Sequence, residues 1–222
     1  MSHFHLQHLN RANYIQSIGL IKDEKTSGFA TMCLEWWDKQ CGWYCDGCIA
    51  LSDESDAHLC YIFFRIDRYK EYVTIHNIFT PLLLRRNGYA YELLKAVFEI
   101  ALCDDVKRFK FVSISKSLDF YLSLGFIYWG LNSVGDYYCD LPMPKLGLEG
   151  VKEMTQKCTV DELLGKKLDF IFEKVMNNEA KLSSTKQTEY IDDKNKMKES
   201  YMFAELSDIK KASSMLIAPS FV

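Results

Sequence analysis

The most constraining feature of this chain is a strand, a tight basic turn and an amphipathic helix that follow one another between Tyr72 and Leu102. The first part is rich in Val, Ile, Thr and Phe, and Pro81 ends the predicted strand because proline cannot donate to a β-ladder. Gly88 lets the backbone approach a ligand closely at the first turn of the predicted helix. Unpaired N–H groups and the positive end of the helix dipole favour an anion there, so the segment predicts a cradle for phosphate groups.

The residues of the turn discriminate between nucleotide-binding folds. The turn has neither the Gly-Lys-Ser/Thr of a Walker loop nor a Gly-x-Gly-x-x-Gly run. Residues 85–90 read Arg-Arg-Asn-Gly-Tyr-Ala, which resembles Arg/Gln-x-x-Gly-x-Gly/Ala, the pyrophosphate-binding signature of the GNAT superfamily of acyl-CoA-dependent N-acyltransferases. A second run, Ser117 to Phe126, resembles the other signature of that family, a short helix carrying Phe-Tyr followed by Gly-Phe and a final strand.

The resemblance implies acetyl-CoA as co-substrate and no metal. In the family, two parallel strands separate and the pantetheine arm of CoA occupies the gap much as an added strand would. The residues that the resemblance implies for CoA binding are Ile78, Phe79, Thr80, Arg85, Arg86, Asn87, Gly88, Tyr89, Ala90 and Ser117.

The resemblance also implies catalytic roles for two side chains. Tyr121 matches the general acid of the family, and a phenol of pKa ~10 can protonate a leaving thiolate, whose conjugate acid has a pKa of ~8.5, as its charge develops. Tyr121 can equally be a packed core aromatic. Relatives often carry an acid on the strand before the cradle, whereas this chain has His76, the natural substitute as a base. A structural role for His76, or Glu35 or Asp46 acting through water, remains open.

The predicted reaction is direct transfer of an acetyl or short acyl group from acyl-CoA to a primary amine, on a small molecule or a peptide. An aromatic zone of Trp36, Trp37, Trp43, Tyr44, Tyr137 and Tyr138 is expected to lie on the acceptor side. One rival is a non-catalytic acyl-CoA-binding module whose C-terminal helices report the bound ligand to a partner. Another is a toxin-like acetyltransferase acting on aminoacyl-tRNA, but the net charge of −3 disfavours a nucleic-acid partner.

Composition sets the class of protein. A chain of 222 residues can bury one substantial core with an appendage. It contains no apolar run of the roughly 20 residues needed to cross a bilayer, and its N-terminus does not resemble a secretory signal, so we expect a cytoplasmic protein.

Eight cysteines in such a chain should be mostly reduced thiols. Cys41, Cys45 and Cys48, with His58 and Cys60 further on, raise the possibility of a zinc site. Paired knuckles need two Cys-x-x-Cys units, and no second unit accompanies Cys45 and Cys48, so buried structural thiols are favoured.

The fold class expected is α/β (α+β): a mixed, mostly antiparallel sheet flanked by helices, similar to the GNAT fold, over residues 1–145. The expected elements are strand 4–9, helix 10–18 capped by Asn10, helix 28–39, strand 42–51, turn 52–56, strands 58–66 and 72–80, a crossover helix to Leu102, strand 109–115, and a broken strand 128–141.

Residues 146–222 are expected to form a helical extension. Thr159 to Glu162 fits a capping box for a helix that runs to about Ala180. Residues 183–198 are polar and expected to be loose, and a last helix is expected at 201–215. The extension can cover the core or a homodimer seam, or it can bind a partner.

Overall fold

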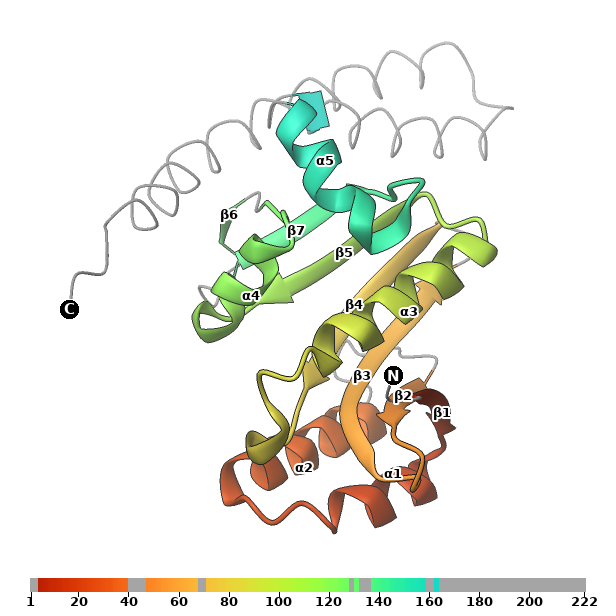
Figure 1. The fold of residues 1–222 in the computed structure, drawn as a ribbon, viewed down its shortest axis with the longest axis vertical. Coiled ribbons are helices and arrows are strands. Elements are labelled where there is room, and N and C mark those ends of the chain that lie inside the picture. Colours follow the sequence, from red (N-terminus) through yellow and green to blue (C-terminus); the bar gives the residue numbers. More distant parts are fainter. Residues whose placement is uncertain are drawn as a thin grey trace, which may run out of the picture. The chain divides into compact units, whose positions relative to one another are not determined.

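The computed structural model describes residues 4–39, 47–67, 71–127, 130–131, 137–158 and 162–163. The chain divides into two compact units (Figure 1). Unit 1 contains residues 1–109 and 145–149, and unit 2 contains residues 110–144 and 150–222. Within the described residues, no helix is both long and apolar enough to cross a membrane.

Unit 1 is built on an antiparallel sheet. The strands β1 (His5–Leu9), β2 (Gly47–Ser52), β3 (His58–Asp67) and β4 (Tyr72–Phe79) lie side by side in chain order. Each of them pairs antiparallel with the next. The predicted meander is thereby confirmed. The predicted strand 42–51 was placed too early, since β2 begins at Gly47 and residues 42–46 lie outside the described part of the chain.

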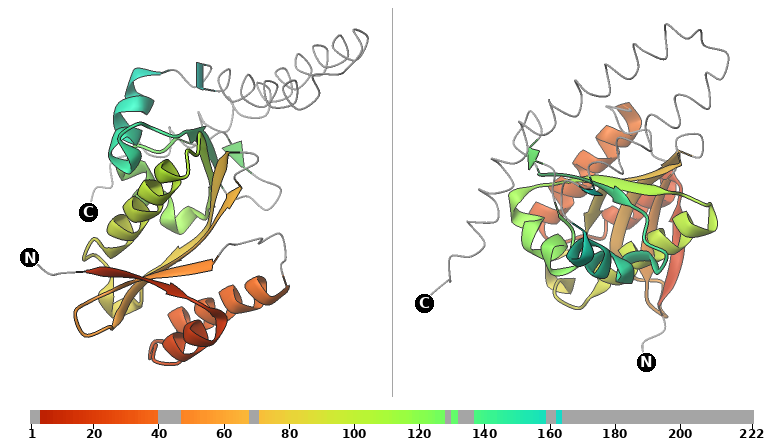
Figure 2. Two further views of the ribbon diagram at one scale, coloured as in Figure 1. Left: turned by 90° about the vertical axis from the view of Figure 1, so that its right-hand side faces the viewer. Right: turned by 90° about the horizontal axis from the view of Figure 1, so that it is seen from above.

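One face of this sheet is covered by α1 (Arg11–Ile18) and α2 (Glu24–Lys39), and the other face by α3 (Tyr89–Cys103) (Figure 2). Asn10 caps α1 as predicted, because its side-chain oxygen accepts the N–H of Asn13 at 2.9 Å. Tyr14, Tyr61 and Phe63 lie in the core between the sheet and the first two helices, and the ring of Tyr14 contacts those of Tyr61 and Phe63 at centroid distances of 6.0 and 5.2 Å.

The helix α2 starts one turn earlier than the sequence predicted. Asp23 accepts the N–H of Thr26 at 2.8 Å with its side chain and the N–H of Ser27 at 2.9 Å with its carbonyl, which satisfies the first turn. Gly28, the predicted first residue, lies one turn inside the helix. It is exposed, and a Cβ built on it would have no atom within 4 Å.

Replacing Gly28 by alanine should therefore stabilise the protein. Alanine removes conformational freedom from the unfolded chain and meets no obstacle in the folded one, so we expect a gain of about 0.5–1 kcal/mol in the free energy of unfolding. Urea denaturation of the two proteins measures this gain. A lowered denaturation midpoint would show that the position is crowded.

The helix α3 follows β4 and the turn, and it buries Leu93, Leu94, Val97 and Phe98. After α3, the backbone N–H groups of Lys107 and Arg108 donate to the carbonyl of Glu71, at 3.0 and 3.2 Å. The chain therefore returns to the start of β4 after a helical crossover, as a parallel connection requires. Residues 145–149 also belong to this unit, and Glu149 pairs with Lys95 at 2.6 Å.

Unit 2 contains most of β5 (Arg108–Ser113), the short helix α4 (Leu118–Ser123), the antiparallel pair β6 (Gly130–Leu131) and β7 (Tyr137–Pro142), and α5 (Gly150–Lys157). Strand β5 is shifted and shorter than the predicted strand 109–115, because the chain turns into a 3-10 helix at Ser115–Ser117. The sequence did not predict α5.

The turn after α4 packs closely on α5. Gly125 has φ +89°, and a Cβ added to it would lie 2.4 Å from the Cα of Lys152. Thr155 donates its hydroxyl to the carbonyl of Gly125 at 2.7 Å. Glycine is therefore required here both by its φ angle and by the lack of space.

The elements and their pairing confirm the predicted α/β class, with mostly antiparallel strands and flanking helices. The helix predicted from Thr159 to Ala180 lies outside the described residues except for Glu162 and Leu163, which are helical. The loose segment 183–198 and the helix 201–215 lie wholly outside them. The predicted division into residues 1–145 and 146–222 stays a prediction.

Candidate functional site

The strand before the cradle contains a bulge at His76. Phe63 of β3 pairs with Asn77, and the next residue, Phe64, pairs with Ile75, so His76 is the extra residue of β4. A bulge bends the strand, weakens the ladder locally and changes the direction of a side chain. His76 is half-buried at this point. The sequence placed His76 correctly on the strand but gave no sign of the bulge.

The end of β4 offers backbone rather than side chains to a ligand. The ring of Phe79 is in the core, stacked on Tyr61 with centroids 4.8 Å apart. Thr80 donates its hydroxyl to the thiol of Cys60 at 3.2 Å. Ile78 pairs with Ile62 of β3, and its side chain is half-buried.

The turn that follows is folded by its own side chains. Arg85 donates its Nε–H to the carbonyl of Thr80 at 3.0 Å, and Asn87 donates to the carbonyls of Leu84 and Arg85 at 3.0 and 3.4 Å. Arg86 is exposed and takes φ +69°. Arg85 therefore shapes the cradle through its side chain, in addition to the charge that the sequence suggested.

The first turn of α3 is open to an anion. Gly88 is the N-cap residue, with φ +81° and no side-chain capping hydrogen bond. The first N–H groups of a helix, here those of Tyr89 and Ala90, have no acceptor within the helix. A Cβ at Gly88 would have no atom within 4 Å. The backbone from residues 85 to 90 can thus receive a phosphate group without side-chain obstruction.

Asp23 connects α2 to this turn, which the sequence analysis missed. Besides capping α2, its carboxylate accepts the backbone N–H of Leu82 at 3.2 Å. The hydrogen bond from Thr26, helped by the backbone N–H groups of Thr26 and Leu82 and the charge of Arg85, lowers the pKa of Asp23. The acidic start Asp-Glu before an apolar helix was the available signal.

The two predicted site residues of unit 2 lie in and before α4. Ser117 donates its hydroxyl to the carbonyl of Ile114 at 3.0 Å. Tyr121 is buried, and its ring contacts Phe111, Phe120 and Phe126 at centroid distances of 4.5–5.8 Å. This packing suits the core-aromatic alternative and leaves the role of its hydroxyl open to experiment.

Unit 1 also contains a cavity of about 600 Å³, which we call the α1 cavity. It is lined by Gln7, Leu9, Asn13, Gln16, Ser17, Leu20, Ile21, Lys22, Asp23, Asp56, Ala57, His58, Tyr61, Pro81, Leu83 and Leu84. A series of hydrogen bonds runs along its wall. Ser17 Oγ is bonded to His58 Nδ1 and lies 2.5 Å from Tyr61 Oη, while His58 Nε2 lies 2.6 Å from Gln7 Oε1.

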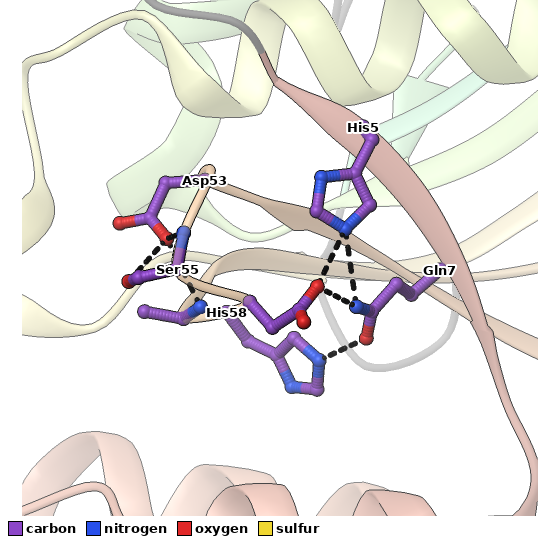
Figure 3. Close-up of polar contacts among 7 residues, drawn as sticks. His5, Gln7, Asp53, Ser55 and His58 are labelled. Carbon is purple, nitrogen blue, oxygen red and sulfur yellow. Dashed lines mark hydrogen bonds and ion pairs between the residues drawn. The ribbon is translucent and has the colours of Figure 1, made fainter.

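The same series continues to the protein surface (Figure 3). Gln7 donates its Nε2–H to Asp56 at 2.8 Å, and His5 Nε2 lies 2.9 Å from the same carboxylate oxygen. Burial is the main cause that lowers the pKa of His58, and burial raises the pKa of Tyr61. These residues come from β1, α1, the β2–β3 turn and β3, so no spacing in the sequence pointed to the cluster.

Part of the predicted acceptor zone is core. Trp37 packs on Tyr14 and Phe63 at centroid distances of 5.9 and 5.6 Å. Trp43 and Tyr44, and the side chains of Tyr137 and Tyr138, lie outside the described part of the chain.

The cysteines that can be located in this region are structural. Cys48 and Cys60 are buried, and burial raises the pKa of the Cys60 thiol to about 12. Among the described residues no three His, Cys, Asp or Glu side chains are grouped to hold a metal ion. Cys41 and Cys45 lie outside the described residues.

Comparison with known proteins gives matches in structure only. No protein-family model matches the chain, and no curated protein matches its sequence. Nourseothricin acetyltransferase is 14% identical with a TM-score of 0.41, and the match covers 44% of this chain and 65% of that one, less than two thirds of its length.

Two further matches are crystal structures of complexes with CoA. The PaiA N-acetyltransferase of Thermoplasma acidophilum is 10% identical, with a TM-score of 0.48 over 62% of this chain and 98% of that one. The GNAT family N-acetyltransferase YhbS of Escherichia coli is 12% identical, with a TM-score of 0.49 over 68% and 87%. At this level of similarity neither the substrate nor the mechanism of this chain follows from the matches. The three matched proteins named here are acetyltransferases.

Proposed function

We propose that this protein is an N-acetyltransferase of the GNAT type, which transfers an acetyl or short acyl group from acyl-CoA to a primary amine within a ternary complex. The observation that carries the proposal is the cradle. A bulged strand leads into a turn that its own side chains fold, and Gly88 then opens α3 with uncapped N–H groups. This is an arrangement for a pyrophosphate bound by backbone.

The proposed chemistry includes two proton transfers, one from the attacking amine and one to the leaving sulfur. The amine nitrogen attacks the thioester carbon, the C–S bond breaks, and the nitrogen loses a proton. Tyr121 supplies a proton to the leaving sulfur, and His76, or water next to it, takes the proton from the nitrogen. The cradle residues hold the pyrophosphate, and the backbone of Ile78 to Thr80 holds the pantetheine arm.

Calorimetry with acetyl-CoA, followed by a mass-spectrometric screen of amines, tests this function. We expect micromolar binding and a mass increase of one acetyl group on at least one amine. Absence of binding would refute the proposal. Binding without turnover on any amine would support the rival function, a non-catalytic acyl-CoA-binding module, which the burial of Tyr121 also suits.

The role of His76 is tested by its pH dependence. If His76 is the base, kcat/KM should rise with pH across the neutral region, and His76→Ala should remove this rise while leaving CoA binding unchanged. The bulge motivates the test, because bulges redirect side chains next to active sites. An unchanged pH profile together with a lowered melting temperature would make His76 a structural residue.

A further inference from the structure

The hydrogen-bond series along the α1 cavity has a fixed direction. The carboxylate of Asp56 accepts from Gln7 Nε2, so the amide oxygen of Gln7 must accept from His58 Nε2–H. In the neutral imidazole Nδ1 is then an acceptor, so the hydroxyl of Ser17 donates to it, and the hydroxyl of Tyr61 donates to Ser17.

This direction decides what the cavity can bind. Each hydroxyl hydrogen of Ser17 and Tyr61 is used inside the series, and lone pairs remain on both oxygens. Both side chains are buried, with 6% and 2% of their surface exposed, and both line the cavity. Buried oxygens that can only accept further hydrogen bonds favour a ligand that donates them.

The charges around the cavity favour a cation. Asp23 and Asp56 line it, against the single cation Lys22 among the lining residues. The C-terminal end of α1 lies at Ser17 to Gly19 and carries the negative end of the helix dipole. The N–H groups of Gly19, Leu20 and Ile21 all donate to carbonyls of α1, so this turn offers no donors to an anion.

We propose that the α1 cavity is a binding site for a primary ammonium compound with an apolar body. The ammonium group donates to the oxygens of Tyr61 and Ser17, and the carboxylate of Asp56, at the other end of the series, attracts its charge. The body lies on the aliphatic part of the lining, which Leu9, Leu20, Ile21, Pro81, Leu83 and Leu84 provide. The site shares Pro81, Leu83 and Leu84 with the segment that leads into the turn at residues 85–90, but it does not require acyl-CoA.

The turn that carries Asp56 is ordered without a ligand. Asp53 accepts the N–H groups of Ser55 and Ala57 at 2.9 and 3.0 Å and the hydroxyl of Ser55 at 2.7 Å, which fixes the turn that carries Asp56 (Figure 3). Asp56 itself has φ +62°. A ligand therefore meets an ordered carboxylate, and little ordering entropy opposes binding.

Three probes of equal length and different charge test the proposal by calorimetry without CoA: hexylamine, hexanol and hexanoate. We expect hexylamine to bind about tenfold more tightly than hexanol, and hexanoate not to bind. Equal affinities, or preference for hexanoate, would overturn the proposal. Since CoA is absent, failure here leaves the proposed acyl transfer untouched, and failure of acyl transfer leaves this site untouched.

Two charge-neutralising variants locate the bound amine. Asp56→Asn should weaken hexylamine binding about tenfold, and asparagine tolerates the positive φ of this position. Glu54→Gln removes the same charge from the same exposed turn, outside the cavity lining, and should change the affinity less than about twofold. Equal losses in both variants would show general attraction by surface charge and would refute the site.

Acidification should release the amine. The groups around His58 are His5 on β1, Tyr61 on β3, Asp56 in the turn, and Lys22 and Asp23 after α1. Burial lowers the pKa of His58, so it is neutral at about pH 7.5 and gains its charge only below the usual histidine range. Binding should fall as the pH drops through the range in which His58 gains its charge, and His58→Gln, which does not titrate, should reduce this fall. A pH dependence unchanged in His58→Gln would exclude His58 from the site.

Discussion

Replacing Gly88 by aspartate is expected to weaken acetyl-CoA binding at least about 30-fold. The new carboxylate would project from the N-cap of α3, where the proposed site receives a pyrophosphate, and two like charges about 5 Å apart near a protein surface repel by roughly 3 kcal/mol. A Cβ at this position meets no atom within 4 Å, so the folding cost comes only from the φ of +81°, which an asparagine variant shares. Calorimetric titration with acetyl-CoA measures the loss.

Gly88→Asn is the matched control. Asparagine has nearly the same shape as aspartate and accepts the left-handed backbone conformation that φ +81° requires, but it carries no charge. We expect it to reduce the affinity by no more than about threefold. Equal affinities of the aspartate and asparagine variants would show that the pyrophosphate binds elsewhere.

The second large effect is expected for Tyr121→Phe, which should lower kcat about 100-fold or more while acetyl-CoA affinity stays nearly constant. The aromatic ring, which packs on Phe111 and Phe126, remains in place, so the fold should be preserved. Only the proton for the leaving sulfur is lost. Steady-state kinetics with the amine found in the screen, together with calorimetry, separates the two quantities.

Tyr91→Phe serves as the control for Tyr121. It removes the same phenolic hydroxyl from α3, at a position to which we assign no part in the reaction, and kcat should be unchanged. If Tyr121→Phe lowers the melting temperature and leaves kcat intact, Tyr121 is a packing residue. The non-catalytic function would then gain support from its burial.

Local rules explain which parts of the fold were predictable from sequence. Asn10 caps α1 through the N–H three residues later, and the apolar runs of β3 and β4 match their predicted bounds to within one residue. The predicted start of α2 at Gly28 was wrong, because the carboxylate of Asp23 caps the helix one turn earlier. α5 was not predicted, because Gly150 to Lys157 is a short and mostly polar run that begins with glycine, and its apolar residues are too few to distinguish a helix from a loop.

The candidate site divides in the same way. The cradle is one contiguous segment, so its turn chemistry could be recognised from the order of residues alone. The bulge at His76 depends on how β3 and β4 are paired, which no single strand encodes. The series from Tyr61 to Asp56 depends on the docking of α1 against β1 and β3. Such clusters form only through tertiary packing, and the sequence pattern of one segment does not encode that packing.

The lack of a side chain at Gly125 allows α5 to pack closely against the turn after α4. The backbone of α5 passes where any other residue would place a Cβ, and Thr155 fastens it by a hydroxyl bond to the Gly125 carbonyl. A protein shortened at residue 145 would therefore expose a surface already shaped to receive a helix. Gly125, part of the Gly-Phe pair that resembles a family signature, thus also provides the space in which α5 packs. Substitutions at Gly125 should affect the packing of α5 as well as any chemistry.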